Sequence, residues 1–255
     1  MRIVTLIENT ASREDLAAEH GLSLYIETEK HKILFDSGQS AAFTDNAETL
    51  GVDLTQVDLA VLSHGHYDHG GGLPHFLRRN EKAPVWLNPH AFEPHFNASE
   101  KDLGLDPVLQ SSDRIRFAEE GQRIGEGLTL YSNIGCPYGI RPFGLTMGNR
   151  QPEDFRHEQY LLIEEAGKRV LLSGCSHRGI LNIMKWFRPD VLVGGFHFMK
   201  MDPSGGELEA AAAALRRYPC IYYTGHCTGE AQFDALKVTL GHRLHRLSGG
   251  VEIVL

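Results

Sequence analysis

Three histidines and one aspartate fall within six consecutive positions, directly after an apolar segment: His64, His66, Asp68 and His69. Neutral imidazole nitrogens are good ligands for zinc and iron, and an aspartate adds a hard oxygen donor. Glycines follow at 70–72, and they let the backbone curl tightly enough for neighbouring side chains to converge. We therefore interpret this segment as a metal site and not as a row of solvated loop histidines.

A metal site of this kind needs strands and helices to position it. Apolar, β-rich runs predict strands over 2–8, 22–28, 32–36, 57–63, 84–88, 128–132, 159–164, 169–173, 191–195, 220–224 and 251–255. Helical patterns lie between them, over 41–50, 71–79, 179–187, 204–218 and 231–240, and Ser204 is the expected cap of the fourth. This order predicts an α/β fold with packed sheets and helices outside.

Length and composition limit the classes of function. The 255 residues fit one domain, 1–255, and the polar segment 89–127 is predicted to be an insertion that forms a cap over the substrate. A net charge of −8 argues against general nucleic-acid binding, and no run of 18 apolar residues predicts a membrane span. The four scattered cysteines favour a reduced, cytoplasmic location. The expected partner is a small-molecule substrate, and no oligomeric state is predicted.

The motifs together resemble a known family. Asp36-Ser37-Gly38 after a strand, followed by His-x-His-x-Asp-His, resembles the metallo-β-lactamase superfamily over nearly the whole chain. The stretches 174–180, 194–197 and 225–229 and the last strand resemble one subfamily, that of the dihydropterin–ribofuranosylaminobenzene phosphate synthase of methanopterin biosynthesis. Most of its members are described only as metal-dependent hydrolases. The resemblance implies an αββα sandwich with a metal site at one edge.

The resemblance also implies a set of metal ligands. His64 and His66 would hold a first metal. Asp68 and His69 would reach a second, with His226 as its last ligand. One or two divalent ions per chain are expected, with zinc in first place and manganese, magnesium or iron as alternatives.

Two positions of this ligand set stay open. The third ligand of the first metal is either His157 or His177, and a position in a strand-to-helix turn favours His177. Cys175 stands where the superfamily has a bridging carboxylate. Its thiolate could ligate zinc; alternatively it is a small buried residue, and the second metal binds weakly or not at all.

Other residues are assigned supporting roles. The resemblance implies that Asp36 holds the metal loop rather than the metal, with a plain turn aspartate as the alternative. His197 is predicted to contact substrate or stabilise a leaving group, and a buried structural histidine is the alternative. Asp68 is expected to orient or accept a proton.

Anion binding and the remaining histidines complete the predictions. Arg178 is the preferred contact for an anionic group because it precedes a predicted helix, and Arg141 and Arg150 are further candidates. His90 and His95 are interpreted as surface residues of the insertion.

The predicted function is metal-dependent hydrolysis of a small phosphorylated or heterocyclic substrate by a metal-activated hydroxide. One alternative, implied by the subfamily, is a synthase-like transferase in which the metals bind a pyrophosphate leaving group. Two further alternatives are a non-catalytic ligand-binding protein and a di-iron redox protein that needs a partner.

Overall fold

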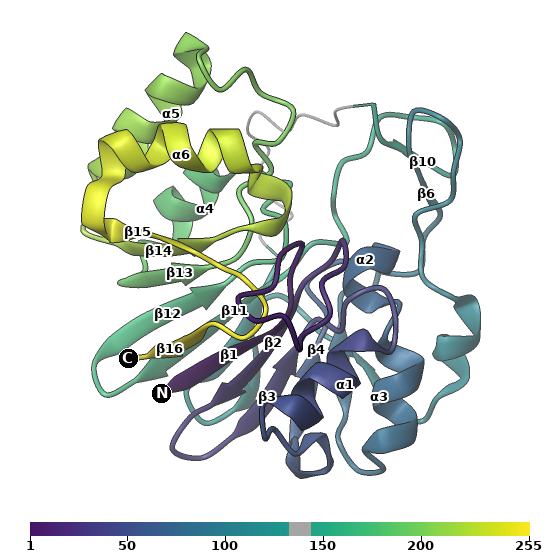
Figure 1. Cartoon of the computed structure of the whole chain (residues 1–255). Helices are drawn as coiled ribbons and strands as arrows, with labels where there is room; N and C mark the ends of the chain where they lie inside the picture. The colour runs from purple at the N-terminus through teal and green to yellow at the C-terminus, as the bar shows by residue number, and fades with distance from the viewer. Residues whose placement is uncertain (133–143) are drawn as a thin grey trace.

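Two seven-stranded sheets pack face to face, and helices cover their outer faces (Figure 1). This arrangement is seen in a computed structural model that describes residues 1–132 and 144–255. It is the predicted αββα sandwich. No helix of these residues is both long and apolar enough to cross a bilayer.

The first sheet has the order β16-β1-β2-β3-β4-β5-β7. Its strands are β1 (Arg2–Ile7), β2 (Ser23–Glu27), β3 (Lys32–Phe35), β4 (Leu59–Val61), β5 (Val85–Leu87), β7 (Ile115–Phe117) and β16 (Glu252–Val254). The helices α1 (Ala42–Thr49) and α3 (Leu73–Arg79) lie against it (Figure 1). Their buried Phe43 and Phe76 belong to one apolar cluster with Leu34 of β3.

The second sheet has the order β15-β14-β13-β12-β11-β9-β8. Its strands are β8 (Gln122–Gly125), β9 (Leu128–Tyr131), β11 (Tyr160–Glu165), β12 (Lys168–Leu172), β13 (Val191–Val193), β14 (Ile221–Thr224) and β15 (Leu244–Arg246). Its covering helices are α4 (Ile180–Phe187), α5 (Gly206–Arg216) and α6 (Glu230–Leu240) (Figure 1).

The inner faces of the two sheets share one apolar core. Phe35 and Val61 of the first sheet belong to the same buried cluster as Leu130, Leu161 and Leu172 of the second. Strand pairing is parallel from β3 to β4 and from β12 through β14. Parallel strands end at the same edge of a sheet, so the loops that follow them gather there.

The predicted strands and helices are found, with shifts of a few residues at their ends. The structure adds β7, β8 and β15, and a separate pair of β6 (His95–Phe96) with β10 (Thr146–Met147). Strands of only two to four residues are too short to show a period in the sequence. The segment 89–127 therefore supplies edge strands to both large sheets, and it also supplies β6, whose pair with β10 rises above α2 (Tyr67–Gly70) in Figure 1.

One predicted helix cap is wrong. Ser204 does not cap α5; its hydroxyl donates to Asp202 Oδ1 at 2.8 Å, and Gly205 stands at the N-cap without a side-chain bond.

Candidate metal centre

The predicted metal-binding residues gather at the edge where the parallel strands end. His64 and His66 follow β4, and Asp68 and His69 lie in α2. From the second sheet come the residues after β12, which are Cys175 and His177, and His226 after β14. All seven are buried. The site thus draws donors from both sheets.

The first cluster contains three imidazoles. The ring centroids of His64 and His66 lie 4.7 Å apart, those of His64 and His177 lie 4.9 Å apart, and those of His66 and His177 lie 5.0 Å apart. The Nε2 atoms of His64 and His177 are 3.3 Å apart. One nitrogen from each ring therefore points into a common space.

His157 lies behind this cluster. Its Nδ1 accepts a hydrogen bond from the Gly65 backbone N–H at 2.8 Å. A neutral imidazole that accepts at Nδ1 carries its proton on Nε2 and has no second lone pair for a metal. Of the two residues left open as the third ligand, the geometry favours His177.

Asp36 controls the tautomers of two histidines. Its carboxylate accepts from the Ser63 backbone N–H at 2.7 Å, from Ser63 Oγ at 2.8 Å and from His69 Nδ1 at 2.7 Å. The Ser63 oxygen then accepts from His64 Nδ1 at 2.8 Å, because its own proton goes to Asp36. His64 and His69 therefore both keep a bare Nε2 lone pair, as a carboxylate-backed metal ligand does.

The second cluster combines nitrogen, oxygen and sulfur. His69 Nε2 lies 3.2 Å from Cys175 Sγ and 3.2 Å from His226 Nε2. Asp68 Oδ2 lies 3.3 Å from His226 Nε2. The His226 Nδ1 is held at 2.8 Å by Asn9 Oδ1, which again turns Nε2 inward.

Cys175 lies between the two clusters. Together with His64 and His69 it forms one group whose ligand atoms are within 4.8 Å of one another, and with His226 and Cys227 it forms another. Burial raises the pKa of the Cys175 thiol. The structure therefore places a sulfur atom inside the site, where a bound cation would be needed to stabilise its thiolate form.

Burial and mutual proximity keep the first cluster neutral. Burial lowers the pKa of His64 and of His177, and it lowers the pKa of His66 to about 3. Burial also opposes ionisation of Asp68, but the neighbouring His69 and His226 outweigh it and hold the pKa of Asp68 well below its usual range. Burial likewise opposes the charge on His226, yet the hydrogen bond to Asp68 and nearby negative groups raise the pKa of His226 to about 8.

These donors fit a divalent transition metal. Three neutral imidazoles with converging nitrogens are a ligand set that zinc, iron or manganese accepts. In the second cluster a positive charge lies between Asp68 and His226 in the form of a proton. A metal cation can displace this proton and take its place beside the Asp68 carboxylate.

Several residues of this edge have a left-handed backbone. The φ angles are +58° at Asp36, +56° at Ser176, +54° at His197 and +46° at His226. Each costs of order 1–2 kcal/mol for a residue with a side chain. Strain of this kind gathers at functional sites, where the surrounding packing enforces it.

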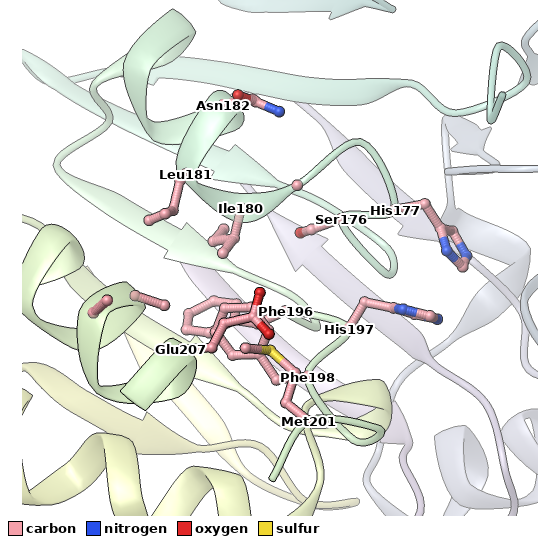
Figure 2. A pocket seen from close by; sticks show the side chains of 13 residues that line it. Ser176, His177, Ile180, Leu181, Asn182, Phe196, His197, Phe198, Met201 and Glu207 are labelled. Atoms are coloured by element: carbon pink, nitrogen blue, oxygen red, sulfur yellow. The ribbon is translucent and has the colours of Figure 1, made fainter. Parts of the chain in front are cut away.

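A cavity of about 390 Å³ opens beside the first cluster. In Figure 2 His177 and His197 stand at one end of it, while Phe196, Phe198 and Met201 form an apolar wall. Ile180, Leu181 and Asn182 of α4 and Glu207 of α5 also line it. The cavity can take a small, largely apolar group next to the histidines.

His197 lies beside the first cluster, and its role as a substrate contact stays a prediction. Its ring centroid lies 4.3 Å from that of His177. Burial lowers the pKa of His197 to about 4, so the ring is neutral at pH 7. Whether it takes part in catalysis stays a prediction.

The predicted anion contacts lie elsewhere. The Arg178 side chain is 3% exposed and does not line the cavity; its positive charge lowers the pKa of Glu158, which burial raises. Arg150 is exposed and lies 3.7 Å from Glu100. Arg141 lies outside the described residues. Anion binding by Arg178 therefore stays a prediction.

Sequence reasoning missed the residues that hold the loops. Glu158 accepts from the backbone N–H groups of His177 and Arg178, at 2.7 and 3.0 Å. Glu8 accepts from the backbone N–H of His226. Only contacts across the fold reveal these roles, as for Asn9 and Ser63, and no local motif marks them.

Comparison with known proteins decides the family. The family model of the metallo-β-lactamase superfamily matches residues 17–139. The crystal structure of Tm1679, a metal-dependent hydrolase of the β-lactamase superfamily, is 30% identical, covers 100% of this chain and 99% of its own, and has a TM-score of 0.85. The chain belongs to the metallo-β-lactamase superfamily.

Two curated relatives from Methanocaldococcus jannaschii match this superfamily member along most of their length. The uncharacterized protein MJ0448 is 28% identical in an alignment 239 positions long that covers 89% of this chain and 90% of the relative. A 7,8-dihydropterin-6-methyl-4-(beta-D-ribofuranosyl)-aminobenzene-5'-phosphate synthase is 26% identical in an alignment 268 positions long that covers 90% of this chain and 88% of the relative. The predicted resemblance to the superfamily and to this synthase is confirmed.

Proposed function

We propose that this metallo-β-lactamase superfamily protein is a metal-dependent hydrolase of a small phosphorylated or heterocyclic substrate. One observation carries the proposal: Asp36, directly or through Ser63, and Asn9 hold the Nδ1 atoms of His69, His64 and His226, so that the Nε2 atom of each ring is turned toward the two clusters. His64, His66 and His177 would hold one ion. Asp68, His69, Cys175 and His226 would hold a second. Zinc is the first candidate.

Each group of residues at the site has a distinct role in this reaction. A divalent ion in such a site lowers the pKa of bound water and polarises the bond to be cleaved. Asp68 stays ionised because its pKa is held low, so it can orient or accept a proton. His197, neutral at pH 7, faces the cavity and contacts the substrate. Phe196 and Phe198 support binding of a flat or apolar substrate group.

A transferase is the second candidate. The relative named as a synthase supports it, since the match extends over 90% of this chain. The same ligands would serve group transfer, and the cavity would then have to take an aromatic acceptor beside the metal ligands. Hydrolysis is preferred because Tm1679, at higher identity, is described as a metal-dependent hydrolase.

Metal content is the first test. Protein purified without chelator or added metal would be analysed by plasma mass spectrometry, for wild type, His64→Ala and the control His90→Ala, a partly exposed residue. Two zinc or manganese ions per wild-type and His90→Ala chain, with loss in His64→Ala, support the proposal. One ion would show that Cys175 fails as a bridge.

Activity is the second test. Phosphoesters, lactones and pterin substrates would be screened with the metal-loaded protein, and formation of a joined product would favour the transferase. Bound iron with a reducible absorption band would favour the redox alternative. Absence of metal from carefully purified wild type would contradict the proposal and favour a ligand-binding protein.

Location and partners are part of the same proposal. A cytoplasmic location is supported by the free thiols of Cys175, Cys220 and Cys227 in the described part of the chain. The size of the cavity supports a small-molecule substrate, and the acidic net charge argues against nucleic acid as a partner.

A further inference from the structure

A further group of three histidines lies behind the cluster of His64, His66 and His177. His66, His95 and His157 form a group in which one ring nitrogen of each lies within 4.8 Å of the others. The rings of His95 and His157 stack with centroids 3.9 Å apart. The Nε2 atoms of all three are buried and have no hydrogen-bond partner. His95 is 1% exposed, so its interpretation as a surface histidine is wrong.

The tautomers of two of these rings follow from their partners. Glu153 Oε2 lies 2.7 Å from His95 Nδ1, and because a carboxylate only accepts, His95 carries its proton on Nδ1 and a lone pair on Nε2. His157 is the reverse: its Nδ1 accepts from Gly65, and its Nε2 carries the proton. The His157 Nε2 lies 3.8 Å from Glu153 Oε1.

This pattern excludes a metal ion bound by all three rings, because an ion would need a lone pair from each and the Nε2 of His157 offers a proton. It fits a buried water molecule instead. Such a water can donate to His95 Nε2 and accept from the N–H groups of His157 and His66, which satisfies three buried polar atoms together.

We propose that Glu153, His95 and His157, joined by one buried water, are positioning residues that hold His66 as the Nε2–H tautomer. The lone pair of His66 is then on Nδ1, available to the cluster with His64 and His177. The inference rests on the metal binding proposed above.

The surrounding backbone ties His95, the network residue that lies in the insertion, to the metal-binding loop. The carbonyl of His95 accepts from Leu103 N–H at 2.7 Å, and the carbonyl of Leu103 accepts from Tyr67 N–H at 2.8 Å. A Cβ at Gly65 would lie 2.1 Å from the Ala91 carbonyl oxygen, so the same segment also packs directly on the His64–His66 loop. The β6 region thus supports the metal loop from behind.

Nitrogen NMR on metal-free, histidine-labelled protein tests the tautomers. We expect a proton on Nδ1 of His95 and on Nε2 of His157 and His66. A proton on His95 Nε2, on His157 Nδ1 or on His66 Nδ1 would overturn the proposal, whether or not the protein binds metal.

Cobalt(II) binding tests the effect on the metal site, by chelator competition and by the visible absorption of the bound ion. We expect His95→Ala to weaken binding of the ion held by His66 by 10- to 100-fold and to shift its spectrum, with unchanged stoichiometry. Glu153→Gln, which keeps the side-chain shape, should act in the same direction and covers the case in which His95→Ala does not fold. His90→Ala, in the same segment and paired with Glu93, is the control.

The outcomes separate the two proposals. If wild type binds no cobalt, the proposed function fails, and the NMR result decides the network. If wild type binds cobalt and both variants bind it with unchanged affinity and spectrum, the network is wrong. Loss of one whole ion in His95→Ala would make His95 a ligand and would also overturn it.

Discussion

Asp36→Asn should show how much the orientation of the metal-binding histidines contributes to metal affinity, because the variant leaves the ligands themselves unchanged. The carboxylate of Asp36 accepts three buried hydrogen bonds, two from Ser63 and one from His69 Nδ1. An asparagine of the same shape has one acceptor oxygen and one donor NH2 group. With the oxygen on the Ser63 backbone N–H, the NH2 group faces His69 Nδ1, which must then accept. The proton of His69 moves to Nε2, the atom that lies 3.2 Å from Cys175 Sγ.

The magnitude follows from these bonds. Loss of a partner that orients a metal ligand costs 10- to 100-fold in metal affinity, or about 1.4–2.8 kcal/mol. Each hydrogen bond to a charged group contributes roughly 1.5–3 kcal/mol to folding, so the free energy of unfolding of the metal-free variant should also fall. All three donors are buried, so water cannot replace the lost interactions.

The assay is zinc affinity by competition with a chromophoric chelator, beside urea unfolding of the metal-free protein. Asp53→Asn is the control, because Asp53 is an exposed aspartate that accepts from Thr55 in a surface turn. Equal zinc affinity of Asp36→Asn and wild type, in a folded protein, would refute the assignment of the His69 tautomer.

Three further predictions concern the same edge of the fold. Cys175→Ser should lower the affinity for the second ion and leave the first bound, which metal titration followed by mass spectrometry would show; two unchanged affinities would mean that the sulfur is not a ligand. Gly174→Ala should lower the melting temperature, because its Cβ would lie 2.1 Å from Ser63 Oγ, whereas Gly206→Ala, with nothing within 4 Å, should not. Chelation of metal should also lower the melting temperature of wild type, since an ion at 100 times its Kd stabilises the fold by about 2.7 kcal/mol, and an unchanged calorimetric scan would argue against a bound ion.

The sequence predicts the parts of this protein that have a local pattern. The run His64–His69 marks the metal-binding loop because residue type and spacing suffice there. Long apolar strands such as β1 and β11 are found for the same reason. The sequence favours His177 over His157 as a ligand but does not decide between them, because the decision depends on the hydrogen bond from Gly65 to His157.

Other parts depend on contacts between distant residues. Asn9 meets His226 across 217 positions, and nothing near Asn9 in the sequence predicts this. His95 resembles a loop histidine because its neighbours are polar, but Glu153 and His157 bury it from a different segment. Ser204 has a typical capping sequence, yet its hydroxyl binds Asp202 instead.

The position of β16 affects how the chain can fold during synthesis. This strand pairs with β1, Arg2 opposite Val254, although every strand between β8 and β15 in the second sheet comes before it in the chain. The edge of β1 therefore stays uncovered until residue 254 has left the ribosome. Until then its apolar residues, such as Ile3, lack their partner on β16, which for Ile3 is Ile253. The first sheet therefore cannot be completed until the second has been synthesised, and an uncovered strand edge is a known start of aggregation. The nascent protein should therefore depend on chaperones until translation has passed this strand.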